Sequence, residues 1–96
     1  MRIRLLEIAQ IEFDQAIEYY NYESPGLGNA FLTVVLKALD RIGEFPEAWH
    51  PLSARTRRCQ TRRFPYGNIY QVRQDEMLIV AIANLHRSPD YWKDRL

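Results

Sequence analysis

The feature that most constrains the fold of this chain is the uninterrupted apolar run from Met77 to Ala83, which predicts a buried strand over Met77–Leu85. Two further strand patterns precede it, at Arg57–Phe64 and at Asn68–Arg73. The connections between the three strands hold only a few residues, and connections this short join antiparallel neighbours. The sequence therefore predicts a three-stranded antiparallel meander, with its longest and most apolar strand at the centre.

The first half of the chain carries two helical patterns behind one short strand. Residues 1–6 alternate between apolar and basic side chains, as a strand with one buried face does. Apolar residues then recur at helical spacing over 8–22 and over 27–44. Between the two helices, Ser24-Pro25-Gly26 forms a break in which Ser24 is suited to cap the second helix. The expected core stripe of that helix is Phe31, Val34, Val35, Ala38, Ile42 and Phe45.

These elements predict an α+β fold in the order β-α-α-β-β-β. An N-terminal strand leads to an antiparallel helix hairpin, a loop over 46–51 precedes the three-stranded antiparallel meander, and the helices cover one face of the sheet. A length of 96 residues fits one domain spanning 1–96. Hydrophobic residues make up 47% of the chain, which excludes a disordered polypeptide.

Composition also bounds the environment of the protein. Cys59 is the single cysteine, so no internal disulfide forms, and a reducing cytosol suits it. No apolar run approaches the ~20 residues that span a bilayer, and the N-terminus has no signal-peptide pattern. His50, His86 and Cys59 are too scattered to bind a metal together. We therefore expect a cytoplasmic protein with no metal, no cofactor and no membrane contact.

Charge is distributed unevenly along the chain. Residues 1–50 hold four Lys/Arg and eight Asp/Glu, which gives about −4, whereas residues 51–96 hold nine and four, which gives about +5. Five arginines lie between Arg55 and Arg63 with no acidic residue among them. This asymmetry indicates an anionic partner for the second half, although a solvated basic strand explains the charges equally well.

The second predicted helix is apolar around most of its circumference. Leu32, Leu36 and Leu39 form a stripe beside the core stripe. The extra apolar surface is either covered by the first helix or available as a docking site for another chain.

The C-terminal residues can carry RNA chemistry. Cleavage that uses the 2′-OH of RNA needs a base, an acid and cations at the phosphate. His86 can exchange a proton near neutral pH, and Arg87, Arg62 and Arg63 can hold a phosphate. Tyr91 or Trp92 can stack on an unpaired base. Each residue also has a structural alternative: His86 as a backbone cap, the two aromatics packed on the sheet, Arg95 in a surface ion pair, and Glu12 and Glu18 solvated.

Three segments together resemble a known family: Phe64-Pro65-Tyr66, then Ile69-Tyr70-Gln71-Val72, then Leu85-His86-Arg87-Ser88-Pro89-Asp90-Tyr91-Trp92-Lys93-Asp94-Arg95. They are similar to the RelE/ParE superfamily of toxins from bacterial type II toxin–antitoxin modules. The resemblance covers nearly the whole chain. It implies a toxin that inhibits growth through DNA gyrase or through ribosome-dependent mRNA cleavage, neutralised by a cognate antitoxin. A homodimer and a toxin–antitoxin hetero-oligomer both remain open.

The resemblance does not decide whether the protein is an enzyme. In the mRNA-cleaving branch a basic residue opens the strand that here begins with the neutral Asn68, and Arg62, Arg63, Arg87 and Tyr91 match only loosely. The ParE-like, plasmid-stabilisation branch needs no catalytic residue, and the ending His86–Trp92 and the pair Tyr19-Tyr20 favour it. An active enzyme would be a metal-independent endoribonuclease. The alternative is an inactive relative that binds nucleic acid or a partner without catalysis.

Three sets of residues follow as site candidates. The catalytic candidates are His86, Arg87 and Tyr91. The candidates for nucleic-acid or partner binding are Arg57, Arg58, Arg62, Arg63, Trp92 and Arg95. The candidates for antitoxin docking are Leu32, Leu36 and Leu39.

Overall fold

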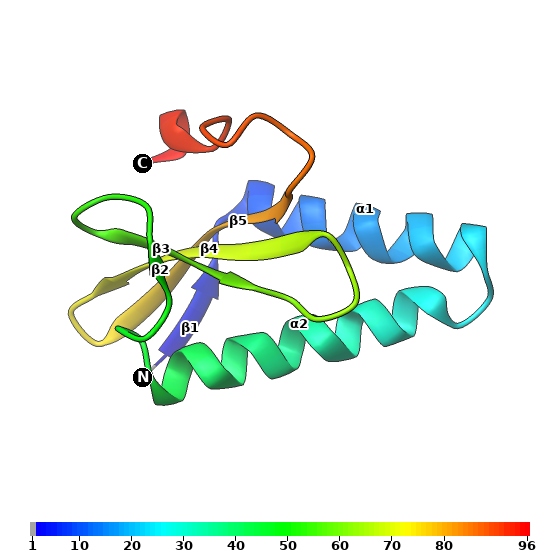
Figure 1. Cartoon of the computed structure of the whole chain (residues 1–96), viewed down its shortest axis with the longest axis horizontal. Coiled ribbons are helices and arrows are strands. Elements are labelled where there is room, and N and C mark those ends of the chain that lie inside the picture. Colours follow the sequence, from blue (N-terminus) through cyan, green and yellow to red (C-terminus); the bar gives the residue numbers. More distant parts are fainter. Residues whose placement is uncertain (1) are drawn as a thin grey trace.

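The computed structural model describes residues 2–96 and confirms the α+β layout (Figure 1). In chain order the elements are β1 (Arg2–Leu5), α1 (Glu7–Glu23), α2 (Leu27–Glu44), β2 (His50–Pro51), β3 (Thr56–Gln60), β4 (Tyr66–Arg73), β5 (Glu76–Asn84) and the 3₁₀ helix η1 (Lys93–Arg95). The short strand β2 lies in the segment that we expected to be a loop.

The strands form one sheet in the order β1-β5-β4-β3-β2. β3, β4 and β5 are the predicted antiparallel meander. The strand expected at the centre, β5, lies second from one edge because β1 pairs with it in parallel, and β4 is the central strand. Ile69 pairs with Ala81 but Tyr70 pairs with Ile79, so Val80 is an extra residue that makes a β-bulge in β5.

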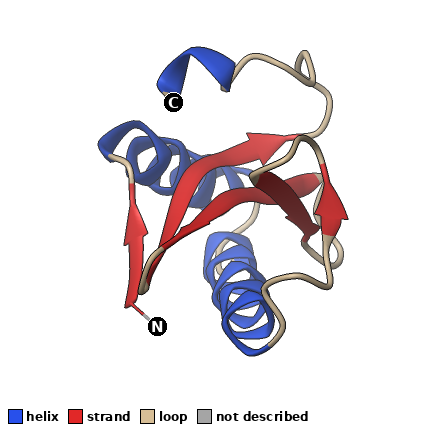
Figure 2. Cartoon of the chain, turned by 90° about the vertical axis from the view of Figure 1, so that its left-hand side faces the viewer, coloured by secondary structure: helices blue, strands red, loops and turns tan. Residues whose placement is uncertain are grey.

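The two faces of the sheet are covered by different parts of the chain. α1 and α2 pack on one face through an aromatic core that includes Phe13, Phe31 and Phe64. The C-terminal segment packs on the other face, where Trp92 contacts the second cluster, which contains Leu78 and Val80. Figure 2 shows η1 and α2 on opposite sides of the sheet.

The two helices meet closely where α2 begins. Gly26 has φ 88°, a left-handed conformation that glycine adopts without strain. A Cβ on Gly28 would lie 2.2 Å from the carbonyl oxygen of Ile17, so only glycine fits there. Asn21 Oδ1 accepts the Gly28 N–H at 2.8 Å. The expected cap Ser24 is wrong, because Gly26 is the N-cap residue and the Ser24 backbone carbonyl accepts the Leu27 N–H.

The core stripe of α2 differs from the prediction at Phe45 and at Leu39. Phe31, Val35, Ala38 and Ile42 are buried as expected, but the Phe45 side chain is 61% exposed because the helix ends at Glu44. Leu39, expected outside the core, is buried within it.

Candidate functional site

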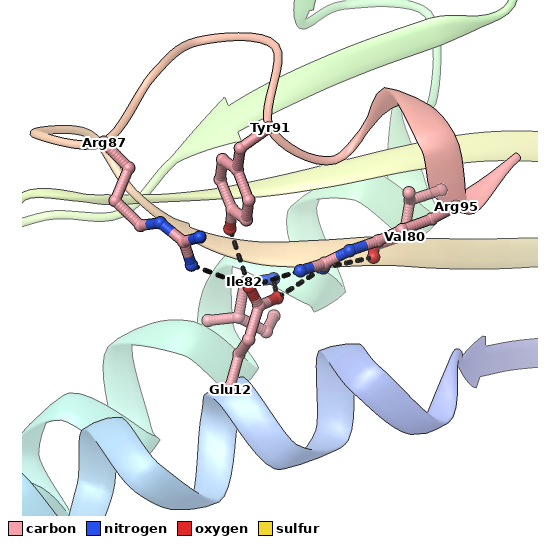
Figure 3. Close-up of polar contacts among 6 residues, drawn as sticks. All are labelled: Glu12, Val80, Ile82, Arg87, Tyr91 and Arg95. Atoms are coloured by element: carbon pink, nitrogen blue, oxygen red, sulfur yellow. Dashed lines mark hydrogen bonds and ion pairs between the residues drawn. The ribbon is translucent and has the colours of Figure 1, made fainter.

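A partly buried carboxylate organises the C-terminal face of the molecule. Glu12 on α1 accepts two hydrogen bonds from the Arg95 guanidinium, at 2.7 Å on Oε1 and 2.9 Å on Oε2. The Tyr91 hydroxyl donates to Glu12 Oε2 at 2.8 Å, and Arg87 Nη1 lies 3.7 Å from the same oxygen. Figure 3 shows the three side chains converging on Glu12 from the C-terminal segment. We call these four residues the Glu12 cluster.

The Glu12 cluster also completes the open edge of β5. β1 pairs with β5 only as far as Ile79, and the chain then turns into α1. Beyond that point, the Ile82 N–H donates to Glu12 Oε1 at 3.2 Å and Arg95 Nη1 donates to the Val80 carbonyl at 3.1 Å (Figure 3). Side chains thus satisfy backbone groups that a longer β1 would otherwise bond.

Two of the three catalytic candidates lie together in this cluster. The Arg87 guanidinium stacks on the Tyr91 ring, 3.8 Å from its centroid. Burial, together with the hydrogen bond to Glu12, raises the pKa of Tyr91 well above its ordinary value, so the hydroxyl stays protonated and acts as a donor. His86 lies apart and is exposed, and its backbone N–H bonds Asn84 Oδ1 at 2.9 Å.

The cluster corrects two sequence-based interpretations. Glu12 was expected to be solvated, but its side chain is only 13% exposed, and Arg95 forms with it a largely buried pair instead of a surface one. A signal for this existed in the sequence: Ala9, Glu12 and Ala16 are spaced three and four residues apart, which sets Glu12 on the buried face of α1. Its partners, 79 and 83 residues away, carry no such signal.

Trp92 packs the C-terminal segment against the sheet. Its side chain is 3% exposed within the cluster that contains Ile69 and Leu78, and Nε1 donates to the Pro89 carbonyl at 2.8 Å. The indole is therefore packed on the sheet, which is the structural alternative that the sequence offered for it.

The basic residues do not lie on one strand. β3 ends at Gln60, and Arg62 and Arg63 are exposed in the loop that leads to β4. The Thr61 hydroxyl closes this loop by donating to the carbonyls of Phe64 at 3.1 Å and Tyr66 at 3.0 Å. Arg63 adopts φ 71° and lies over the Phe64 ring. The prediction of a strand that continues to Phe64 is therefore wrong.

Arg57 and Arg58 do alternate across the sheet. Arg57 pairs with Tyr70, a residue of the helix-side core, whereas Arg58 pairs with Ile69, a residue of the opposite core. Adjacent residues of a strand point to opposite faces, so the two guanidinium groups serve different surfaces.

Each of these arginines lines a separate concavity. The arginine pocket, on the Arg57 side, has a volume of about 1030 Å³ and is lined by Arg2, Pro46, Glu47, Ala54, Arg55, Arg57, Tyr70, Val72, Arg73, Gln74, Asp75 and Glu76. The C-terminal pocket, on the Arg58 side, has about 120 Å³ and includes Arg58, Ile69, Arg87 and Tyr91 in its lining.

Asn68, at the position where the resemblance places a phosphate-holding cation, is fully buried in β4. Neither its side-chain oxygen nor its side-chain nitrogen has a hydrogen-bond partner among the described residues. A buried amide inside the sheet has no contact with a surface-bound phosphate.

The three leucines expected to dock an antitoxin are not equivalent. Leu36 is 48% exposed, Leu32 is half-buried against the core, and Leu39 is buried. The outer side of α1 carries more exposed apolar surface than this stripe, at Ile8, Ile11, Tyr19 and Tyr22.

Comparisons with known proteins bear on the fold. No protein-family model and no curated protein matches the sequence. Among solved structures, the chain is similar to one from the "Chromosomal ParDE TA system from P. aeruginosa", with a TM-score of 0.77 and 13% sequence identity. The similarity covers 90% of this chain and 97% of the other. The protein therefore has the fold of a chain from a toxin–antitoxin system.

Two further observations concern the described residues, 2–96. Within this range, none of the helices has the length and apolar character needed to cross a membrane. Over the same range, no three His, Cys, Asp or Glu side chains gather in a way that suits a metal ion.

Proposed function

We propose that this protein is the toxin subunit of a type II toxin–antitoxin module, of the ParE-like type, and that it arrests growth by binding DNA gyrase. The observation that carries the proposal is the fold similarity to a chain of a ParDE system over 90% of the chain. The ending His86–Trp92 and the pair Tyr19-Tyr20 agree with the ParE-like branch of the resemblance.

The Glu12 cluster supports action by binding instead of catalysis. Metal-free RNA cleavage needs proton-exchanging groups and a cation that are available to the substrate. Here the Tyr91 hydroxyl donates to Glu12, and Arg87 is stacked on Tyr91 and lies close to the same carboxylate. These groups are committed to holding the C-terminal segment on α1 and β5.

A toxin of this kind would be held inactive by an antitoxin encoded beside it. Leu36, together with the exposed apolar residues of α1, offers surface that such a partner can cover. Co-expression with the product of the adjacent reading frame should give a complex that copurifies and buries roughly 1,200–2,000 Å². A protein that stays monomeric and does not bind that product would contradict the assignment as a toxin.

The target can be tested by induced expression with two readouts measured separately. Purified protein should inhibit gyrase supercoiling of plasmid DNA, while mRNA from induced cells stays intact. The variants His86→Ala and Tyr91→Phe should keep full toxicity, because neither side chain takes part in a reaction.

Ribosome-dependent mRNA cleavage is the second candidate function. It is favoured by the C-terminal pocket, where Arg58 and Arg87 line the same concavity. Transcript cleavage that His86→Ala or Arg87→Ala lowers by ~10²–10³-fold in a folded protein would select this candidate. A protein that binds a partner yet inhibits neither growth, gyrase nor translation would be an inactive relative.

A further inference from the structure

Three of the four arginines that line the arginine pocket have no acidic partner among the described residues. Among the described residues, Arg55, Arg57 and Arg73 form no ion pair, whereas Arg2 is paired with Glu76 at 2.6 Å. Ionic attraction from these three guanidinium groups is therefore available to a ligand.

Arg57 is also held in position. Arg57 is a residue of β3, and its Nη1 donates a hydrogen bond to the Trp49 carbonyl at 2.8 Å. A carbonyl leaves the charge of the guanidinium uncompensated and its other N–H groups free. A positioned guanidinium binds a carboxylate or phosphate through paired hydrogen bonds.

One acid of the pocket is already neutralised. Hydrogen bonds from Arg4 and, to a smaller extent, from Arg2 lower the pKa of Glu76 to about 2. This carboxylate therefore stays ionised and paired. Glu47 and Asp75 remain at the rim without ion pairs among the described residues. The pocket therefore offers three free cations and two free anions.

This mixture of charges distinguishes between anionic ligands. A nucleic acid carries a phosphate at every nucleotide and would meet Glu47 and Asp75 with the same sign of charge. A peptide can carry isolated carboxylates for the arginines and N–H donors for the two acids. Val72 is 42% exposed in the lining, which adds an apolar contact for a side chain such as leucine.

We propose that the arginine pocket is a binding site for an acidic, partly apolar peptide segment of a partner protein, with carboxylates on Arg55 and Arg57 and an apolar side chain on Val72. Its volume of about 1030 Å³ is far larger than a single ion requires and accommodates several residues. The inference rests on the proposed function only in taking the antitoxin as the source of the segment.

The test uses a fluorescent peptide of glutamate, leucine and serine, with binding to the full chain measured by anisotropy. Arg57→Ala should weaken binding by roughly tenfold or more, the loss of a charge-assisted contact. Arg58→Ala is the matched control, because this neighbouring arginine faces the other side of the sheet, and it should change affinity by less than about twofold. Thermal melts would check that each variant is folded.

Further variants and peptides test the ionic contact and the apolar contact one at a time. Arg55→Ala, at an exposed position two residues before Arg57, should weaken binding even if Arg57→Ala is unstable. Val72→Ser should weaken the leucine-containing peptide and leave a version with serine in place of leucine unchanged. A version with lysine in place of glutamate should not bind. Rising salt should weaken the acidic peptide.

Three outcomes would overturn the proposal: no binding of the acidic peptide, equal losses for Arg57→Ala and Arg58→Ala, or stronger Arg57-dependent binding of oligouridylate than of the peptide. None of these measurements involves growth or gyrase. Failure here would leave the proposed function standing, and a protein that binds the peptide but is not toxic would overturn the proposed function alone.

Discussion

The Glu12 cluster and the arginine pocket both depend on arginines, but the surroundings of the guanidinium groups differ. In the cluster, Arg95 makes two hydrogen bonds to a carboxylate and a third to a backbone carbonyl, and its side chain is 14% exposed. In the pocket, Arg57 has one carbonyl partner and no carboxylate among the described residues. Arginines therefore serve two purposes here. Those whose guanidinium groups are paired with a carboxylate hold the C-terminal segment in place, and those without a carboxylate partner remain available to another molecule.

The largest effect should come from removing the shared carboxylate of the cluster. Glu12→Ala leaves Arg95 largely buried without its counter-charge and leaves the Ile82 N–H unbonded. We expect the free energy of unfolding to fall by about 3 kcal/mol and the melting temperature by more than about 10 °C. Circular dichroism melts and urea titration would measure both.

Glu18→Ala is the matched control for that variant, since Glu18 is exposed on the same helix. It should change stability by less than about 0.5 kcal/mol. Similar losses for the two variants would remove the distinction between a structural and a solvated carboxylate.

The next effect compares one arginine from each region. Arg95→Ala breaks a two-bond ion pair and should cost about 2 kcal/mol of stability, whereas Arg57→Ala loses one bond to a carbonyl and should cost below about 1 kcal/mol. Urea denaturation of both variants would test the order. In the double variant Glu12→Ala/Arg95→Ala, the loss should be smaller than the sum of the single losses, because both remove the same interaction.

A smaller effect is expected from the tyrosine of the cluster. Tyr91→Phe removes a hydroxyl that donates to Glu12 but keeps the ring that Arg87 stacks on, so we expect a loss of about 1 kcal/mol. Toxicity should persist at full strength. A stable Tyr91→Phe protein that has lost toxicity would instead assign the hydroxyl to the function.

The smallest effect concerns the one acid of the arginine pocket that is already paired. The pKa of Glu76 is lowered from 4.5 to about 2 in the folded protein. Its contribution to stability is therefore present above about pH 4.5 and is lost as the pH falls through about 2. Glu76→Gln should lack this part of the acid dependence. Melting temperatures measured across that range would overlap for the two proteins if the pairing has no effect on stability.

Much of the fold could be predicted because its signals are local. The apolar run at 77–83 fixed the internal strand β5, and helical spacing placed both ends of α2 at residues 27 and 44. The parallel pairing of β1 with β5 and the two-residue strand β2 were not predicted, since neither leaves a periodic pattern. β3 was predicted too long because basic residues continue past Gln60, where the Thr61 hydroxyl closes a loop.

The candidate site was less predictable than the fold. The sequence gathers His86, Arg87 and Tyr91 within six positions, but the contacts of Arg87 and Tyr91 depend on a carboxylate more than seventy residues away, and His86 lies apart. The arginine pocket joins four separate segments, around Arg2, Glu47, Arg57 and Arg73. Such groupings depend on tertiary contacts that one sequence does not reveal.

The parallel pairing of β1 with β5 also has a consequence for how the protein forms on the ribosome. β1 precedes its hydrogen-bonding partner β5 by more than seventy positions, and Arg2 bonds Glu76 across 74 positions. The helix hairpin can form from neighbouring residues as it emerges, but the N-terminal strand waits until β5 has left the exit tunnel. The sheet edge closed by Glu12 and Arg95 also forms late, because these two residues lie 83 positions apart in the chain.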